Sequence, residues 1–300
     1  MNRRPIVALA LSGVLWGTTV PLSKSAVEWA GPAWLTALRF ALAAPVLAWL
    51  VRGRLRQALT APLLVSGALG YGLVILLQNA GIARTSATHA AILVGALPAM
   101  VAMLVAVRGR SRVGGPAAAG FAVAIGGVVL VAGSGESGGD LAGDGLVLLS
   151  LAVAAAFTVI QPALLAGRDA RGVVEATAGQ LTGAALASLV VAVLVDGPPP
   201  LPGEGVDLAS LAALVLLGTL APFTLFAYGQ SRVAPEIAGA FMNLEPLVGA
   251  VAGVVFLGDA FGWRQGVGAA AILAGIALSA GTPAHGAPPE PAYDGAALAA

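Results

Sequence analysis

The sequence predicts an all-α integral membrane protein with ten transmembrane helices, arranged as two five-helix repeats of inverted topology. Composition is the first observation behind this prediction. Of the 300 residues, 58% are hydrophobic and only 10% are charged, whereas soluble domains carry about 25% charged residues. The second is a series of apolar stretches of spanning length, and the third is an internal repeat. A net charge of +1 offers no basic stripe for nucleic acid, and the absence of cysteine excludes disulfides and thiolate chemistry.

Apolar stretches long enough to cross a membrane recur along the chain. A hydrocarbon core of ~30 Å takes ~20 apolar residues as a helix. We predict spans at 6–22, 31–51, 60–80, 86–107, 114–133, 143–165, 173–195, 208–230, 235–257 and 264–281. The start of the chain resembles a signal peptide, but its apolar run continues to Leu22 without a convincing cleavage site, so we interpret it as a spanning helix. Residues 282–300 are rich in Pro, Ala and Gly and are predicted to form a disordered cytoplasmic tail.

Basic residues predict the orientation in the membrane. If the N-terminus is cytoplasmic, nearly all arginines of the loops fall inside, among them the clusters at Arg52–Arg56 and Arg108–Arg112. Only Lys24, Arg84 and Arg264 then fall outside. Because cytoplasmic loops of membrane proteins are enriched in Lys and Arg, we expect a protein of the cell membrane with both termini in the cytoplasm.

The internal repeat divides the chain into a first half, residues 6–133, and a second half, residues 143–281. Segments 79–105 and 227–253 are twins at an offset of 148 residues, with Gly81, Arg84, Ala90 and Pro98 matching Gly229, Arg232, Ala238 and Pro246. Because each half holds five predicted helices, the second copy enters the membrane from the opposite side. Secondary transporters use this inverted arrangement to expose one midplane site to each face in turn. The alternative is a duplication that serves packing alone.

Three phrases of the sequence, together with the repeat, are typical of one transporter family. They are Leu15-Trp16-Gly17-Thr18 followed by Pro21 and Lys24; Pro32…Leu35…Leu38-Arg39-Phe40-Ala41; and Leu244-Glu245-Pro246-Leu247…Gly258-Asp259. In this order they resemble the EamA domains of the drug/metabolite transporter superfamily, over residues 6–281. The resemblance implies export or exchange of small metabolites such as amino acids. The halves differ, since Leu97 stands where the second half has Glu245, and Ala156-Phe157-Thr158 replaces the Trp-Gly-Thr phrase.

Glu245 is the first candidate for binding or coupling. Counting about 1.5 Å per residue from Pro235 places it ~15 Å deep, near the midplane. A carboxylate there either binds a proton or a substrate ammonium, or pairs with an internal cation. Arg39, about 12 Å inside the second helix by the same count, is the candidate partner. Arg39 would otherwise clamp a substrate carboxylate, but we favour a structural role in which it locks the second helix against the ninth.

Further polar residues within the spans are predicted to line a cavity or its mouths. The cavity candidates are Trp16, Thr19, Gln161 and Asn243, and the candidate gates are Gln78 with Asn79 and Tyr228 with Gln230. Asn243 and Glu245 lie about 200° apart on a helix and cannot both face one cavity. His89 is either a proton relay or an ordinary interfacial histidine. Helix-breaking residues are predicted hinges: Pro21, Pro98, Pro162, Pro222 and Pro246.

The remaining patterns concern packing and energy supply. Gly13–Gly17, Gly179–Gly183 and Gly249–Gly253 show the G-x-x-x-G spacing that brings helices close, within a bundle or at a dimer seam. The fifth and tenth helices hold almost no polar groups, so we place them at the periphery of a monomer or homodimer. The sequence has no phosphate-binding G-x-x-x-x-G-K-[ST] loop, no H-E-x-x-H and no plausible metal-ligand cluster, so nucleotide hydrolysis is not the energy source.

These observations together predict a secondary transporter rather than an enzyme, without cofactor or metal. It would export a small amphipathic metabolite through a central cavity by alternating access, with protons as a candidate coupling ion. The alternatives are a membrane-embedded enzyme that acts on a lipid-linked substrate, or a non-transporting scaffold. An enzyme of that kind needs clustered acid and base groups at one interface, whereas the polar residues here are scattered.

Overall fold

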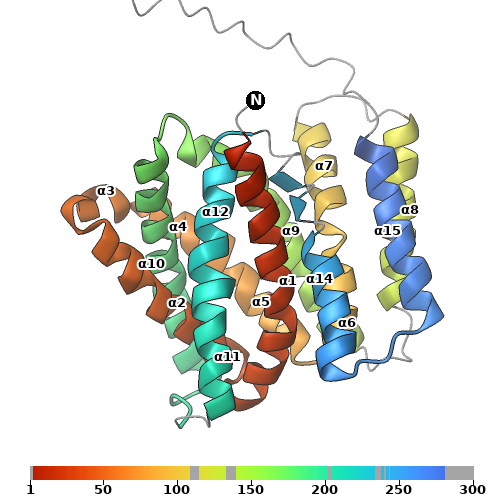
Figure 1. Cartoon of the computed structure of the whole chain (residues 1–300), viewed down its shortest axis with the longest axis horizontal. Coiled ribbons are helices and arrows are strands. Elements are labelled where there is room, and N and C mark those ends of the chain that lie inside the picture. Colours follow the sequence, from red (N-terminus) through yellow and green to blue (C-terminus); the bar gives the residue numbers. More distant parts are fainter. Residues whose placement is uncertain are drawn as a thin grey trace, which may run out of the picture.

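Helices account for all the regular structure in the part of the chain that the computed structural model describes: residues 3–108, 115–132, 140–201, 205–233, 238–239, 241–242 and 244–280. The first half contains α1 Arg4–Ala30, α2 Pro32–Leu50, η1 Arg52–Arg54, α3 Leu55–Ala58, α4 Ala61–Gly67, η2 Ala68–Leu73, α5 Val74–Ile82, α6 Ala87–Val94, α7 Leu97–Arg108 and α8 Gly115–Ala132. The second half contains α9 Leu141–Leu165, α10 Ala170–Val195, α11 Gly205–Val215, η3 Leu216–Leu220, α12 Ala221–Gln230, α14 Leu244–Ala252, η4 Gly253–Leu257 and α15 Trp263–Ala280. Figure 1 shows the long helices side by side in one bundle.

Seven helical segments of the described residues are long and apolar enough to cross a membrane: Arg4–Lys24, Pro32–Leu50, Ala61–Ile82, Ala87–Arg108, Leu141–Leu165, Ala170–Val195 and Asp207–Gln230. Shorter apolar helices lie at Ala118–Val131 and Leu244–Leu257. The predicted all-helical membrane architecture is therefore confirmed. The predicted tail, residues 282–300, lies outside the described residues.

Side chains at the helix ends explain where several helices begin. Gly31, between α1 and α2, has φ +74°, a left-handed conformation that favours glycine. The Asp196 carboxylate then accepts the backbone N–H groups of Ala33 at 3.0 Å and Trp34 at 3.3 Å, which the first turn of α2 leaves without helical partners. Asp169 caps α10 in the same way by accepting from the N–H of Gly172 at 2.7 Å.

Glycines let the helices of the two halves approach closely. A β-carbon on Gly17 of α1 would lie 2.5 Å from Cβ of Val248 on α14, and one on Gly183 of α10 would lie 2.0 Å from the carbonyl oxygen of Leu64 on α4. No side chain fits at such distances, so the G-x-x-x-G pairs on α1 and α10 serve helix packing within the chain. Of the two interpretations of this spacing, packing within the bundle or at a dimer seam, the structure supports the first for these two pairs.

The α8 and α15 helices form a separate pair at one edge of the bundle. They stand side by side in Figure 1 and pack mainly against each other. A β-carbon on Gly275 of α15 would lie 2.4 Å from the carbonyl oxygen of Gly120 on α8. The fifth and tenth predicted helices are thus peripheral, as their lack of polar side chains predicted.

Candidate functional site

A small central cavity lies where helices of both halves meet. Its volume is about 70 Å³, and its wall is formed by residues of α1, η2, α5, α7, α9, α12 and α14 among other segments. Aromatic rings form much of this wall. Trp16 meets Phe223 and Phe226 edge-on, with ring centroids 5.2 Å and 5.0 Å apart, and Tyr71 meets Phe223 at 4.4 Å. The cavity is therefore lined by a cluster of aromatic rings in edge-on contact.

Glu245 is the one charged side chain among the described residues that line this cavity. It belongs to the first turn of α14, is only 6% exposed, and interacts with the side chain of Gln78 on α5. Trp16 and Thr19 also lie on the wall. Four of the predicted site residues thus meet at one cavity, although their role in binding a substrate stays a prediction.

Arg39 lies behind the cavity wall. Its guanidinium donates from Nε to Oγ1 of Thr219 at 3.0 Å and from Nη2 to the carbonyl oxygen of Gly218 at 2.8 Å. Among the described residues it forms no ion pair with Glu245 within 4.0 Å. Its hydrogen bonds thus join the second helix to the π-helical segment η3 of the eighth, and its charge interacts with Glu245 of the ninth helix only at longer range. The lock between the second and ninth helices stays a prediction.

Gln161 belongs to a buried amide network next to the cavity. Its Nε2 donates to the Tyr71 hydroxyl at 3.1 Å and to Oε1 of Gln180 at 3.1 Å, and Gln180 donates back at 2.8 Å. Gln180 also donates to Oγ of Ser66 at 3.2 Å. Gln161 thus reaches the cavity only through Tyr71, which lines it.

The residues predicted as gates separate into different environments. Asn79 is buried and donates to Oγ1 of Thr36 at 2.9 Å, so its amide joins α5 to α2. Tyr228 is half-buried beneath the guanidinium of Arg232, 4.0 Å from its ring centroid, and Gln230 donates to the carbonyl oxygen of Thr158 at 3.4 Å. Neither Asn79 nor Tyr228 lines the cavity. Asn243 lies outside the described residues.

The predicted hinge prolines occupy two kinds of position. Pro21 and Pro162 lie inside the continuous helices α1 and α9. Pro98, Pro222 and Pro246 lie in the first turns of α7, α12 and α14, where a missing N–H is tolerated. Their role as hinges stays a prediction.

Sequence reasoning missed a buried polar pair between the two halves. His89 of α6 is fully buried, and its Nε2 lies 3.1 Å from both carboxylate oxygens of Asp144 in the first turn of α9. His89 is therefore not an ordinary interfacial histidine, and its role as a proton relay stays a prediction. The sequence carried one signal for the burial of Asp144. Asp140 caps α9, so Asp144, four residues later, lies within the first turn of that helix.

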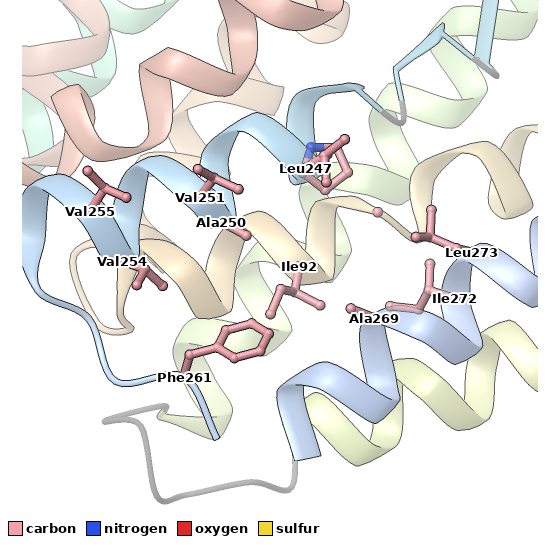
Figure 2. A pocket seen from close by; sticks show the side chains of 12 residues that line it. Ile92, Leu247, Ala250, Val251, Val254, Val255, Phe261, Ala269, Ile272 and Leu273 are labelled. Atoms are coloured by element: carbon pink, nitrogen blue, oxygen red, sulfur yellow. The ribbon is translucent and has the colours of Figure 1, made fainter. Parts of the chain in front are cut away.

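A second pocket, larger than the central cavity, is apolar and lies apart from this chemistry. It has a volume of about 410 Å³ between α14 with η4, α6 and α15, and Figure 2 shows the side chains of these elements around it. Leu247, Val251 and Phe261 on its wall are more than half exposed. Because Glu245 faces the central cavity and the adjacent Pro246 faces this groove, α14 separates the two spaces. No group of three or more potential metal ligands occurs among the described residues.

A membrane-embedded helical bundle with a cavity between its two halves is the architecture of a membrane transporter, and the comparisons with known proteins agree. The model of the EamA-like transporter family matches residues 3–133 and again 141–281. The chain therefore belongs to the EamA family, within the drug/metabolite transporter superfamily.

Two further matches extend over most of the chain. A protein of Archaeoglobus fulgidus described as an uncharacterized transporter is 24% identical over 275 residues, which cover 90% of this chain and 96% of that protein. A solved crystal structure superposes with a TM-score of 0.69 at 20% identity and covers 93% of this chain and 97% of its own. At this identity the structural match shows the shared fold.

Proposed function

We propose that this chain is a secondary carrier of ten spans, whose halves, 6–133 and 143–281, are inverted relative to each other in the cell membrane. It moves a small amphipathic metabolite, such as an amino acid, outward through the central cavity by alternating access. The observation that carries this proposal is that, among the described residues, Glu245 is the one charged group on a cavity wall to which both halves contribute. The distribution of arginines supports cytoplasmic termini.

The cavity suits a solute with a cationic and an apolar part. A carboxylate next to aromatic faces attracts an ammonium group, both by charge and by cation–π interaction. Trp16, Phe223 and Phe226 supply the aromatic faces, and Gln78 and Thr19 supply polar contacts beside Glu245. Protons compete for the same carboxylate, so Glu245 is also the proposed site of proton coupling.

Counterflow tests the proposal. We expect proteoliposomes with the protein, preloaded with an unlabelled amino-acid mixture, to accumulate radiolabelled amino acids of that mixture transiently. Glu245→Gln should abolish this signal, whereas Glu28→Gln, a control at an exposed carboxylate of α1, should leave it unchanged.

Two outcomes would contradict parts of the proposal. Counterflow that persists in Glu245→Gln with its dependence on a pH gradient intact rules out both roles of Glu245. Absence of counterflow across a broad metabolite panel would point instead to a lipid-directed enzyme or a scaffold.

A further inference from the structure

Two π-helical segments occupy equivalent positions in the two halves. One is η2, Ala68–Leu73, and the other is η3, Leu216–Leu220; their first residues are 148 positions apart, the offset of the twin segments. π-Helices make up well under 1% of residues and mostly occur as single turns at functional sites. A repeat-related pair therefore indicates a shared role in the mechanism.

A polar side chain from the opposite half holds each π-helical segment. Arg39, on α2 of the first half, donates to Gly218 and Thr219 of η3. Gln180, on α10 of the second half, donates to Gln161, which in turn donates to Tyr71 of η2. Both π-helical segments are thus bonded across the halves, η3 directly by Arg39 and η2 by Gln161, which Gln180 holds in turn.

The backbone explains why η3 needs a donor. Pro222, at the start of α12, has no N–H and so cannot donate to a carbonyl oxygen of the preceding turn, which contains Gly218. Nη2 of Arg39 donates to the carbonyl oxygen of Gly218 at 2.8 Å. The equivalent position in the first half is Val74, which keeps its N–H, and there the neutral Gln180 suffices.

Each π-helical segment also contacts the cavity wall through a glycine. A β-carbon on Gly70 of η2 would lie 2.2 Å from the ring of Phe157 on α9, and one on Gly218 of η3 would lie 2.8 Å from Cγ2 of Thr19 on α1. Phe157 and Thr19 both line the cavity. Because these contacts are tight, a change in the winding of η2 or η3 displaces the wall.

We propose that η2 and η3 are the flexing points of the transport cycle, and that Arg39 and Gln180 are positioning residues that hold one each. This inference rests on the proposed alternating access between inverted halves. Charge-assisted hydrogen bonds are roughly twice as strong as neutral ones, so η3 is held more firmly than η2. The two alternating states are consequently unequal in stability.

Single cysteines in this cysteine-free chain test the inference without any substrate. Ser150 and Thr158 both line the cavity from α9, and their separation of eight residues corresponds to about 12 Å along the helix. Ser150→Cys and Thr158→Cys therefore report the two ends of the cavity. The measurement is the ratio of their alkylation rates by a water-soluble methanethiosulfonate in proteoliposomes.

Inversion of the halves predicts the sign of the result. Arg39→Gln should shift the ratio in one direction and Gln180→Leu in the opposite direction, each by about threefold or more. Thr219→Val removes one of the two bonds of Arg39 to η3, and Gln161→Leu removes the direct bond to Tyr71 of η2, so they should reproduce the two signs. Thr182→Val, which removes only an ordinary bond to the Ala178 carbonyl within α10, is the control and should leave the ratio unchanged.

Shifts in the same direction, or no shift, overturn the inference, because a merely structural role loosens both ends alike. A failure of the proposed function is seen separately, as absent counterflow in the unmodified protein, while the alkylation ratio still responds.

Discussion

The two halves share one backbone plan but carry different chemistry at equivalent positions. Leu97 and Glu245 are the clearest pair, since both line the central cavity, one apolar and one charged. Arg39 on α2 and Gln180 on α10 form a second pair, because each donates to the opposite half, Arg39 to Gly218 and Gln180 to Ser66. We infer from this comparison that the shared backbone of the halves determines the shape of the cavity. Differences between the halves at single positions determine where charge lies.

The largest effect is expected when Glu245 is replaced by leucine, the residue type that the first half has at the equivalent position. We expect Glu245→Leu to reduce counterflow at least about 100-fold, because the cavity then offers no charge. The melting temperature should change little, since the substitution removes a buried carboxylate but also its longer-range attraction to the buried Arg39. Counterflow and thermal unfolding in detergent would be measured together, with Leu97→Met as the control. A clear fall in melting temperature would show instead that Glu245 has a structural role.

A second prediction concerns Gly67, whose equivalent in the second half is Val215. A β-carbon on Gly67 would lie 1.9 Å from the backbone oxygen of Gln180. We therefore expect Gly67→Val to lower the free energy of unfolding by about 3 kcal/mol or more through overpacking, and Val215→Gly by about 1–2 kcal/mol. Denaturant titration measures both. Gly126→Val, where a β-carbon meets no atom within 4 Å, is the matched control. Equal costs for Gly67→Val and Gly126→Val would contradict the close approach of α4 and α10.

The pair of His89 and Asp144 sharpens the comparison because both members are buried at the contact of α6 with α9. We expect Asp144→Leu to cost about 3 kcal/mol of unfolding free energy, because removing one partner leaves the other buried without it. The double variant His89→Leu with Asp144→Leu should recover most of that loss. A double-mutant cycle with a coupling below about 0.5 kcal/mol would refute a direct interaction.

The smallest effects separate two neighbours on α5. Gln78 lines the cavity, whereas Asn79 donates to Thr36. Gln78→Ala should lower counterflow about tenfold with little change in stability, and Asn79→Ala should cost about 1 kcal/mol of stability with transport intact. If the two variants behave alike in transport and unfolding assays, the assignment of one residue to the cavity and the other to helix contact is wrong.

Much of the architecture was open to prediction because its causes are local. Apolar stretches of spanning length, the turn at Gly31 and the repeated prolines follow from the chemistry of neighbouring residues, and they predict helices and a membrane protein. The placement of Glu245 near the midplane rests on the same counting of helical rise. The family resemblance depended on short phrases such as Leu15–Thr18, which need no tertiary information.

Only the tertiary structure decided which polar groups meet. The contact of Arg39 with Gly218 and Thr219, the burial of His89 against Asp144 and the equivalent π-helical segments η2 and η3 all depend on how each helix is rotated about its axis and how deep it sits. Side-chain packing against distant helices determines those rotations and depths, whereas hydropathy reports only the average environment of a stretch. The sequence by itself therefore determined the helices and the class of protein, and the packing of the two halves decided the geometry of the cavity.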